Sequence, residues 1–208
     1  KGLEQLESLR GNSVNPSTYP FPVLFKRVVG ANYQSVVVAP DFRLVGAMVQ
    51  AAESMIDQGV KAIITSCGFN AIFQKELAAA LQVPVYTSAL LQIPLIRASL
   101  GAKKLLVITA SKPDLKIEHF HAAGVMDMRG IEVYGMEEMP EWSTISRFPD
   151  QLLSIEKIED EVVSLARAAQ QEHPGIGAIL LECTDLPPFA AAVRKAARTQ
   201  VFDLLTMV

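Results

Sequence analysis

The amino-acid sequence predicts an α/β fold with two similar, doubly wound domains built on parallel sheets. Short apolar runs typical of buried strands alternate with segments of helical spacing along most of the chain. The alternation restarts near residue 103, which divides the chain into two comparable halves. Each half also holds one cysteine where a strand-like run passes into a helix-like segment. We therefore expect the domains to be related by a pseudo-two-fold axis, with a ligand cleft between them.

The first half starts with a short polar helix and a loop before the alternation begins. Residues 2–10 read as the helix, and residues 11–22 form a loop rich in proline, asparagine and serine. β-Branched residues followed by a proline predict a buried strand at 35–40. Apolar residues at helical spacing predict a helix at 43–58, which Gly59 ends. The other expected elements are strands at 62–66 and 83–87 and helices at 70–81 and 90–100.

The second half repeats this order. Between two of its elements, residues 137–148 form an irregular segment that could lie over a site. We expect the last strand, at 201–204, to return to the first half. The first domain would then consist of residues 1–94 and 199–208, and the second domain of residues 95–198. Both domains would be of the flavodoxin-like type. The other expected elements are strands at 104–109, 131–136 and 177–182 and helices at 113–123, 151–172 and 187–198.

Composition and charge exclude several classes of function. Half of the 208 residues are hydrophobic, so each domain can bury a core. The net charge is −3 and no basic stripe is present, which argues against a nucleic-acid partner. No apolar run approaches the roughly 18 residues of a membrane span. No export signal is visible either, so we expect a cytoplasmic protein with no membrane partner and with reduced cysteines.

Cys67 and Cys183 are the residues best suited to chemistry. Unpaired N–H groups and the helix dipole at the start of each helix should lower the thiol pKa from about 8.5 toward neutrality. The same N–H groups form an anion site that suits a carboxylate. With one sulfur on each side of a ligand, the pair could remove a proton from one face of a carbon and return it to the other, which is racemase or epimerase chemistry. The alternative is that each cysteine is a small buried hydrophobe.

Residues next to the cysteines supply candidate contacts to a substrate. Gly68 would let the backbone approach the ligand closely. Asp185 has two interpretations, because it could stabilise its own helix as a first-turn acid or manage the proton of Cys183. The other candidates carry hydrogen-bonding side chains: Ser66, Asn70 and Thr184.

The second cysteine motif resembles that of a known enzyme family. Residues 183–187, Cys-Thr-Asp-Leu-Pro, are similar to the Gly-Cys-Thr-x motif of the aspartate/glutamate/hydantoin racemase superfamily. In that superfamily the first cysteine also follows a buried strand far upstream, as Cys67 does. Residues 11–16 and 21–23 are similar to the opening segment of a poorly characterised branch, and residues 201–203 resemble a strand that returns to the first domain. The resemblance covers nearly the whole chain.

The resemblance implies an isomerase that works without pyridoxal phosphate, any other cofactor or a metal. Cys67 and Cys183 would be the acid and base that exchange a proton with the carbon next to the carboxylate of a small, amino-acid-like substrate. A homo-oligomer is also implied. The residues implied to bind the substrate carboxylate are Gly68, Phe69, Asn70 and Thr184, and we expect Ser66, Asp185 and Asn15 to contact the substrate as well.

Two departures from the family pattern leave the substrate open. Gly-Phe-Asn follows Cys67 where many amino-acid racemases have Asn-Thr-Ala, and Asp185 stands where glutamate racemases carry histidine. Within the same superfamily, the alternative is a cis–trans isomerase or a decarboxylase of a small dicarboxylate, for which one cysteine would be essential. From another class, the alternative is a non-catalytic, two-lobed small-molecule binding protein, which needs the cleft but no thiolate.

Overall fold

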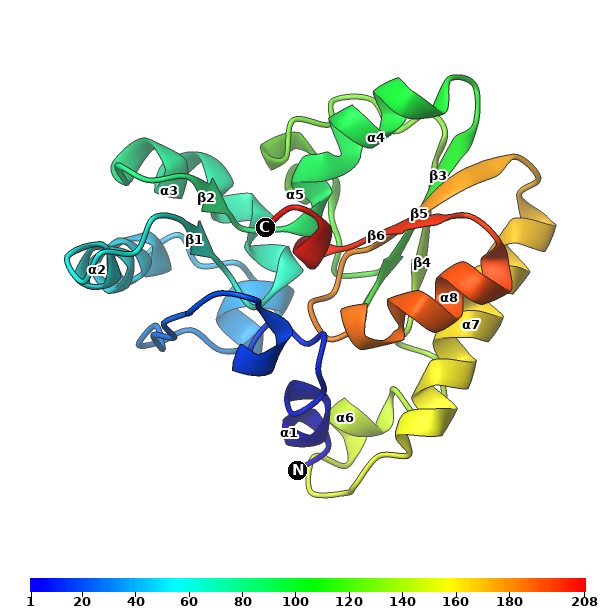
Figure 1. Ribbon diagram of the computed structural model, residues 1–208, viewed down its shortest axis with the longest axis horizontal. Helices are drawn as coiled ribbons and strands as arrows, with labels where there is room; N and C mark the ends of the chain where they lie inside the picture. Colours follow the sequence, from blue (N-terminus) through cyan, green and yellow to red (C-terminus); the bar gives the residue numbers. More distant parts are fainter.

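A computed structural model describes residues 1–208 as two lobes, each built around a parallel sheet (Figure 1). The sheet of the first lobe pairs β1 (Ile63–Ile64) with β2 (Val85–Tyr86). The sheet of the second lobe has the order β4-β3-β5-β6. Its strands are β3 (Lys104–Thr109), β4 (Ile131–Gly135), β5 (Ile176–Leu181) and β6 (Gln200–Phe202). The predicted α/β class with parallel sheets is confirmed.

The larger sheet is covered by helices on both faces, as Figure 1 shows. Leu105 and Val107 of β3 join one buried cluster, and Leu106 and Ile108 join another, because successive side chains of a strand point to opposite faces. Apolar residues are therefore required at nearly every position of the strand. The first cluster includes α4 (Ile93–Leu100) and α5 (Ile117–Ala122), and the second includes α7 (Ile155–Glu172) and α8 (Ala190–Ala197).

In the first lobe, α2 (Leu44–Ile56) and α3 (Gln74–Ala80) pack with β1 and β2 around a smaller cluster. Gly59 has a φ of +96°, in the left-handed region, as its predicted place after the helix requires. The members of this cluster are Met48, Ala52, Ile63, Phe73, Leu77, Leu81 and Val85.

The strand predicted at 35–40 is wrong. The chain forms a π-helical turn, η2 (Gln34–Val38), instead. Asn32 accepts a hydrogen bond from the backbone N–H of Ser35 at 3.1 Å, and the Ser35 hydroxyl donates to Gly30 O at 3.1 Å. These local bonds offer the backbone an alternative to a strand ladder. Val36 and Val37 are buried all the same, so the apolar residues reach the core from a turn.

The chain ends are placed differently from the expected domain division. The first helix, α1 (Gly2–Glu7), packs on the second lobe beside α6 (Thr144–Arg147), where Leu153 N donates to Gln5 Oε1 at 2.6 Å. The last strand, β6, was expected to return to the first half but pairs with β5. After β6, Asp203 O accepts a hydrogen bond from Gln92 Nε2 at 2.7 Å. The domain limits at 94/95 and 198/199 remain a prediction.

None of the helices is both long enough and apolar enough to cross a membrane.

Candidate functional site

Cys67 lies between β1 and the 3-10 turn η3 (Gly68–Phe73). Its backbone is extended, with φ −150° and ψ 122°, so the chain turns directly after it. The backbone N–H groups of Phe69 and Asn70 act to lower the thiol pKa, and the N–H of Asn70 donates a hydrogen bond to Cys67 O at 3.1 Å. The predicted strand–cysteine–helix arrangement is therefore present in the first lobe.

Cys183 occupies the corresponding place after β5. Its thiol donates toward Asp185 Oδ2 at 3.8 Å, and the backbone N–H of Asp185 acts to lower its pKa. The other carboxyl oxygen of Asp185 accepts a hydrogen bond of 2.7 Å from Asn12 Nδ2. Asn12 is fully buried and comes from the loop after α1. The thiol thus lies beside a carboxyl group that a third residue holds in place.

The two cysteine turns are in contact with one another. The Thr184 hydroxyl donates to Ser66 O at 2.6 Å, across 118 positions of sequence. The Glu182 side chain lies so close to Gly68 that a Cβ at that position would be 2.1 Å from Glu182 Oε1. A charge on Cys67 contributes to the raised pKa of the Cys183 thiol. Both cysteines are free thiols and are partly exposed.

The expected lowering of the thiol pKa is wrong. Burial, followed by the charge of Glu182, raises the pKa of Cys67 to about 12. Burial, followed by the charge of Asp185, raises the pKa of Cys183 well above its usual value. The backbone N–H groups act in the expected direction, but desolvation outweighs them. Each thiol is therefore a weak acid, and each thiolate, once formed, is a strong base.

Two carboxyl groups surround the thiols. Burial raises the pKa of Asp185, although its hydrogen bond with Asn12 opposes the shift. Glu182 is 0% exposed, and burial raises its pKa to about 7. Its Oε2 accepts a hydrogen bond of 2.8 Å from the hydroxyl of Thr109, whereas its Oε1 has no partner. The sequence-based reasoning missed Glu182, although a glutamate that ends a fully apolar strand is a sign of burial.

The remaining predicted residues lie in different environments. Asn70 is buried, and its Oδ1 has no partner. The Phe69 ring is buried edge-on against His119, so this residue contributes its backbone. Ser66 is exposed and contributes its carbonyl to the Thr184 bond. Asn15 bonds only within its own segment, to Ser8 and Ser17. Roles in substrate binding remain predictions for all of these residues.

No protein-family profile matches the chain. The chain is 30% identical over 207 residues to a dimethylsulfoniopropionate lyase from Durusdinium sp. clade D, covering 95% of this chain and 67% of that protein. The chain belongs to the dimethylsulfoniopropionate lyase family. It is also 28% identical to dimethylsulfoniopropionate lyase 3 of Emiliania huxleyi (strain CCMP1516), over 94% of this chain. It spans only 53% of that relative's length, so this family of enzymes includes considerably longer members.

Solved structures with the same fold are racemases. An aspartate racemase from Picrophilus torridus aligns with a TM-score of 0.55 and 14% identity, covering 97% of this chain and 81% of that chain. An allantoin racemase from Pseudomonas fluorescens aligns with a TM-score of 0.56 and 16% identity, over 79% of this chain and 65% of that chain. The predicted resemblance to the aspartate/glutamate/hydantoin racemase superfamily is therefore confirmed for the fold.

The hydroxyl of Thr184 provides a test of the contact between the cysteine turns in this lyase-family chain. Thr184→Val removes the bond to Ser66 O and should reduce the free energy of unfolding by about 1 kcal/mol. It should also reduce activity, because the turns lose their direct link. Thr199→Val is the matched control, because Thr199 makes a similar 2.7 Å bond to Gly177 O away from the cysteines. Urea denaturation should show a similar loss of stability in both variants, whereas enzymatic activity should fall only in Thr184→Val. Equal activity in both variants would contradict a role for this contact.

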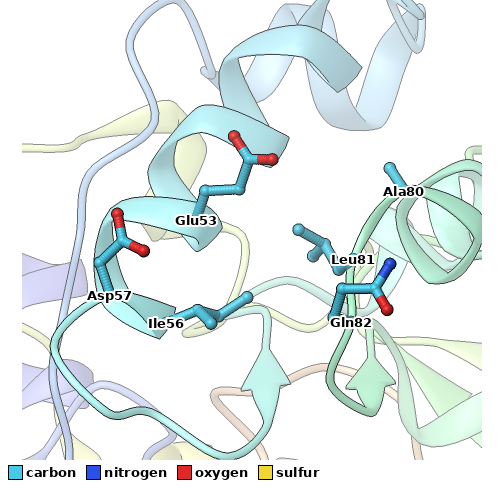
Figure 2. Close-up of a pocket in the computed structure, with 6 residues that line it drawn as sticks. All are labelled: Glu53, Ile56, Asp57, Ala80, Leu81 and Gln82. Carbon is cyan, nitrogen blue, oxygen red and sulfur yellow. The ribbon is translucent and has the colours of Figure 1, made fainter.

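Two pockets lie away from the cysteines. One, of about 90 Å³, lies between α2 and the end of α3, with Glu53 and Asp57 on one side and Gln82 on the other (Figure 2). The other, of about 260 Å³, lies between α5 and β4. Neither contains a nucleophile beside a base. The second pocket is lined by Lys112, Leu115, Ile117, Phe120, Met128 and Val133.

Proposed function

We propose that the protein is a lyase that cleaves dimethylsulfoniopropionate into dimethyl sulfide and acrylate. The observation that carries this proposal is the Cys183 thiol beside Asp185, whose carboxyl Asn12 holds in place. The substrate named by the relatives carries a carboxylate, and its sulfonium leaving group is attached to the carbon two positions away. Removal of a proton from the carbon between them permits elimination, and this step needs one base.

Protons and electron pairs are conserved in the proposed elimination. The Cys183 thiol first loses its proton, which the neighbouring Asp185 carboxylate accepts. The thiolate then takes a proton from the carbon next to the substrate carboxylate. The electron pair of that C–H bond forms the C=C bond of acrylate, and the C–S bond breaks so that dimethyl sulfide leaves with its electron pair. Asp185 then releases its proton to solvent, and no redox change or cofactor enters this sequence.

The charges around the thiols support a substrate with a positive group. The charged side chains that raise the thiol pKa values are the carboxyls of Glu182 and Asp185. Carboxylates near a substrate attract a sulfonium cation and disfavour a second anion. The N–H group of Phe69, beside Cys67, suits the carboxylate end of the same molecule. The site thus offers complementary charges to both ends of a zwitterion.

A racemase or epimerase with a two-cysteine mechanism is the second candidate. It is favoured by the mutual influence of Cys67 and Cys183 and by the racemase fold. In this case one thiolate removes the proton and the other thiol returns it to the opposite face of the same carbon. A decarboxylase or cis–trans isomerase would instead depend on one cysteine. A homo-oligomeric state and a cytoplasmic location also remain predictions.

The candidates are separated by their products. The purified protein is incubated in deuterated water with dimethylsulfoniopropionate, aspartate, glutamate or allantoin. Release of dimethyl sulfide together with an equal amount of acrylate supports the lyase. Deuterium exchange at the carbon next to the carboxylate, without elimination, supports the racemase. If neither reaction exceeds that of a Cys67→Ala/Cys183→Ala double variant, both proposals are wrong.

A further inference from the structure

Glu182 is a buried acid for which the proposed reaction has no role. It follows β5 directly, and its backbone N–H extends the sheet by donating to Ile108 O at 2.8 Å. Its side chain is 0% exposed and has one hydrogen bond, from the Thr109 hydroxyl to Oε2. The other oxygen, Oε1, has no partner within the protein. A buried carboxylate with one oxygen unpaired is unfavourable because its charge is taken out of water, whereas the neutral carboxylic acid carries no charge to desolvate.

The same side chain touches both cysteine turns. It is bonded through the backbone to Cys183 and lies against Gly68, the residue that follows Cys67. The ionisable groups around it are Cys67 on the η3 side and Cys183 and Asp185 after β5. From β3 it meets the neutral hydroxyl of Thr109. All three ionisable neighbours are acids, and a cationic side chain is absent from the groups that shift Glu182.

We propose that Glu182 is a positioning residue shared by both cysteines, and that it must be protonated before either thiol can ionise as the base. This inference rests on the proposed function in one respect, which is that a thiolate is the base that removes the substrate proton. Together, Glu182 and the two thiols can hold one negative charge at low free energy. That charge lies either on the Glu182 carboxylate, with both thiols protonated, or on one thiolate, with Glu182 as a neutral acid. Glu182 takes its proton from solvent, and the Cys183 thiol then passes its own proton to Asp185 as in the proposed step, so charge and atoms balance.

This arrangement predicts a specific pH dependence of thiol reactivity. The pKa of Glu182 is about 7, so near neutral pH it is present in both forms. Its charge is the second largest cause of the raised pKa of Cys67 and the third largest for Cys183. Removing the charge should therefore make both thiols easier to ionise. A side chain that only fills space beside Gly68 would have no such effect.

The experiment measures iodoacetamide alkylation of each cysteine against pH, with the two sites separated by peptide mass mapping. Glu182→Gln keeps the volume and removes the charge. We expect the apparent pKa of Cys67 to fall, and each unit of the fall raises the alkylation rate below the pKa by about tenfold. Asp203→Asn is the matched control, because Asp203 is another buried acid but does not act on either thiol. It should leave both alkylation profiles unchanged.

A second variant leaves Glu182 in place. Thr109→Val removes the hydrogen bond that lowers the pKa of Glu182, so the acid stays protonated to a higher pH. Alkylation of Cys67 at pH 7–8 should then be faster than in the original protein. Unchanged or slower alkylation of Cys67 in the folded variants would overturn the inference. Because alkylation requires no substrate, a protein that shows these shifts but releases no dimethyl sulfide would refute the lyase and leave the role of Glu182 standing.

Thermal unfolding gives a further readout of the same group. The pKa of Glu182 is raised in the folded state from 4.5 to about 7. Its contribution to stability is thus fully present below the unfolded value and is lost as the pH rises through about 7. The melting temperature of the original protein should therefore fall over this interval relative to that of Glu182→Gln. A constant difference between the two from pH 4.5 to 8 would contradict a protonated Glu182.

Discussion

Replacing Cys183 with alanine is expected to reduce the rate of dimethylsulfoniopropionate cleavage by about 10²–10⁴-fold, the range that a positioned general base contributes. Cys183 is the thiol that donates toward Asp185, so it has a neighbouring acceptor for its proton. Its pKa lies well above the usual value, which makes its thiolate a strong base for a weakly acidic C–H bond. Release of dimethyl sulfide under saturating substrate measures the loss.

Replacing Cys67 with alanine should have a smaller effect, of about tenfold, because elimination needs one base. The N–H group of Phe69 remains in the Cys67→Ala backbone and can still meet the substrate carboxylate. Circular dichroism of both variants checks that each is folded. Equal and severe losses in the two variants would instead favour the two-base racemase. A Cys183→Ala variant with nearly full activity would refute Cys183 as the base.

The strands of the second lobe could be predicted from sequence because helices cover both faces of that sheet. Nearly every position of β3 and β5 is therefore apolar or small, and the run is visible without knowledge of its partners. The run at 35–40 looks the same but forms a turn, since β propensity measures burial on a pleated surface more than backbone preference. The polar groups of Asn32 and Ser35 decide its conformation.

The positions of the cysteines could be predicted, but their ionisation could not. A strand followed by a cysteine and a turn is a local pattern, and both examples are present. The thiol pKa depends on burial and on Glu182 and Asp185, which are brought together by tertiary contacts. Asn12 was missed for the same reason, since it meets Asp185 across 173 positions of sequence. The helix dipole correctly predicts that the backbone N–H groups lower the thiol pKa. It does not predict the net shift, which is upward because burial and the carboxylates outweigh the N–H groups.

Gly68→Ala is expected to destabilise the fold strongly. An added Cβ would lie 2.1 Å from Glu182 Oε1 and 2.5 Å from the backbone oxygen of Glu182. The side-chain contact could be relieved by a new rotamer, but the backbone contact requires β5 and η3 to separate. We expect the free energy of unfolding to fall by about 3 kcal/mol, the upper part of the range for overpacked cores. Activity should fall with it, because the same movement separates the cysteine turns.

Gly46→Ala is the matched control for this prediction. Gly46 is exposed within α2, and a Cβ there meets nothing within 4 Å. Alanine is preferred to glycine inside a helix, so this variant should be more stable by about 0.5–1 kcal/mol. Urea denaturation of both variants measures the difference. A Gly68→Ala protein as stable as the original would mean that Glu182 does not lie against the Cys67 turn. The contact on which a shared role of Glu182 depends would then be absent.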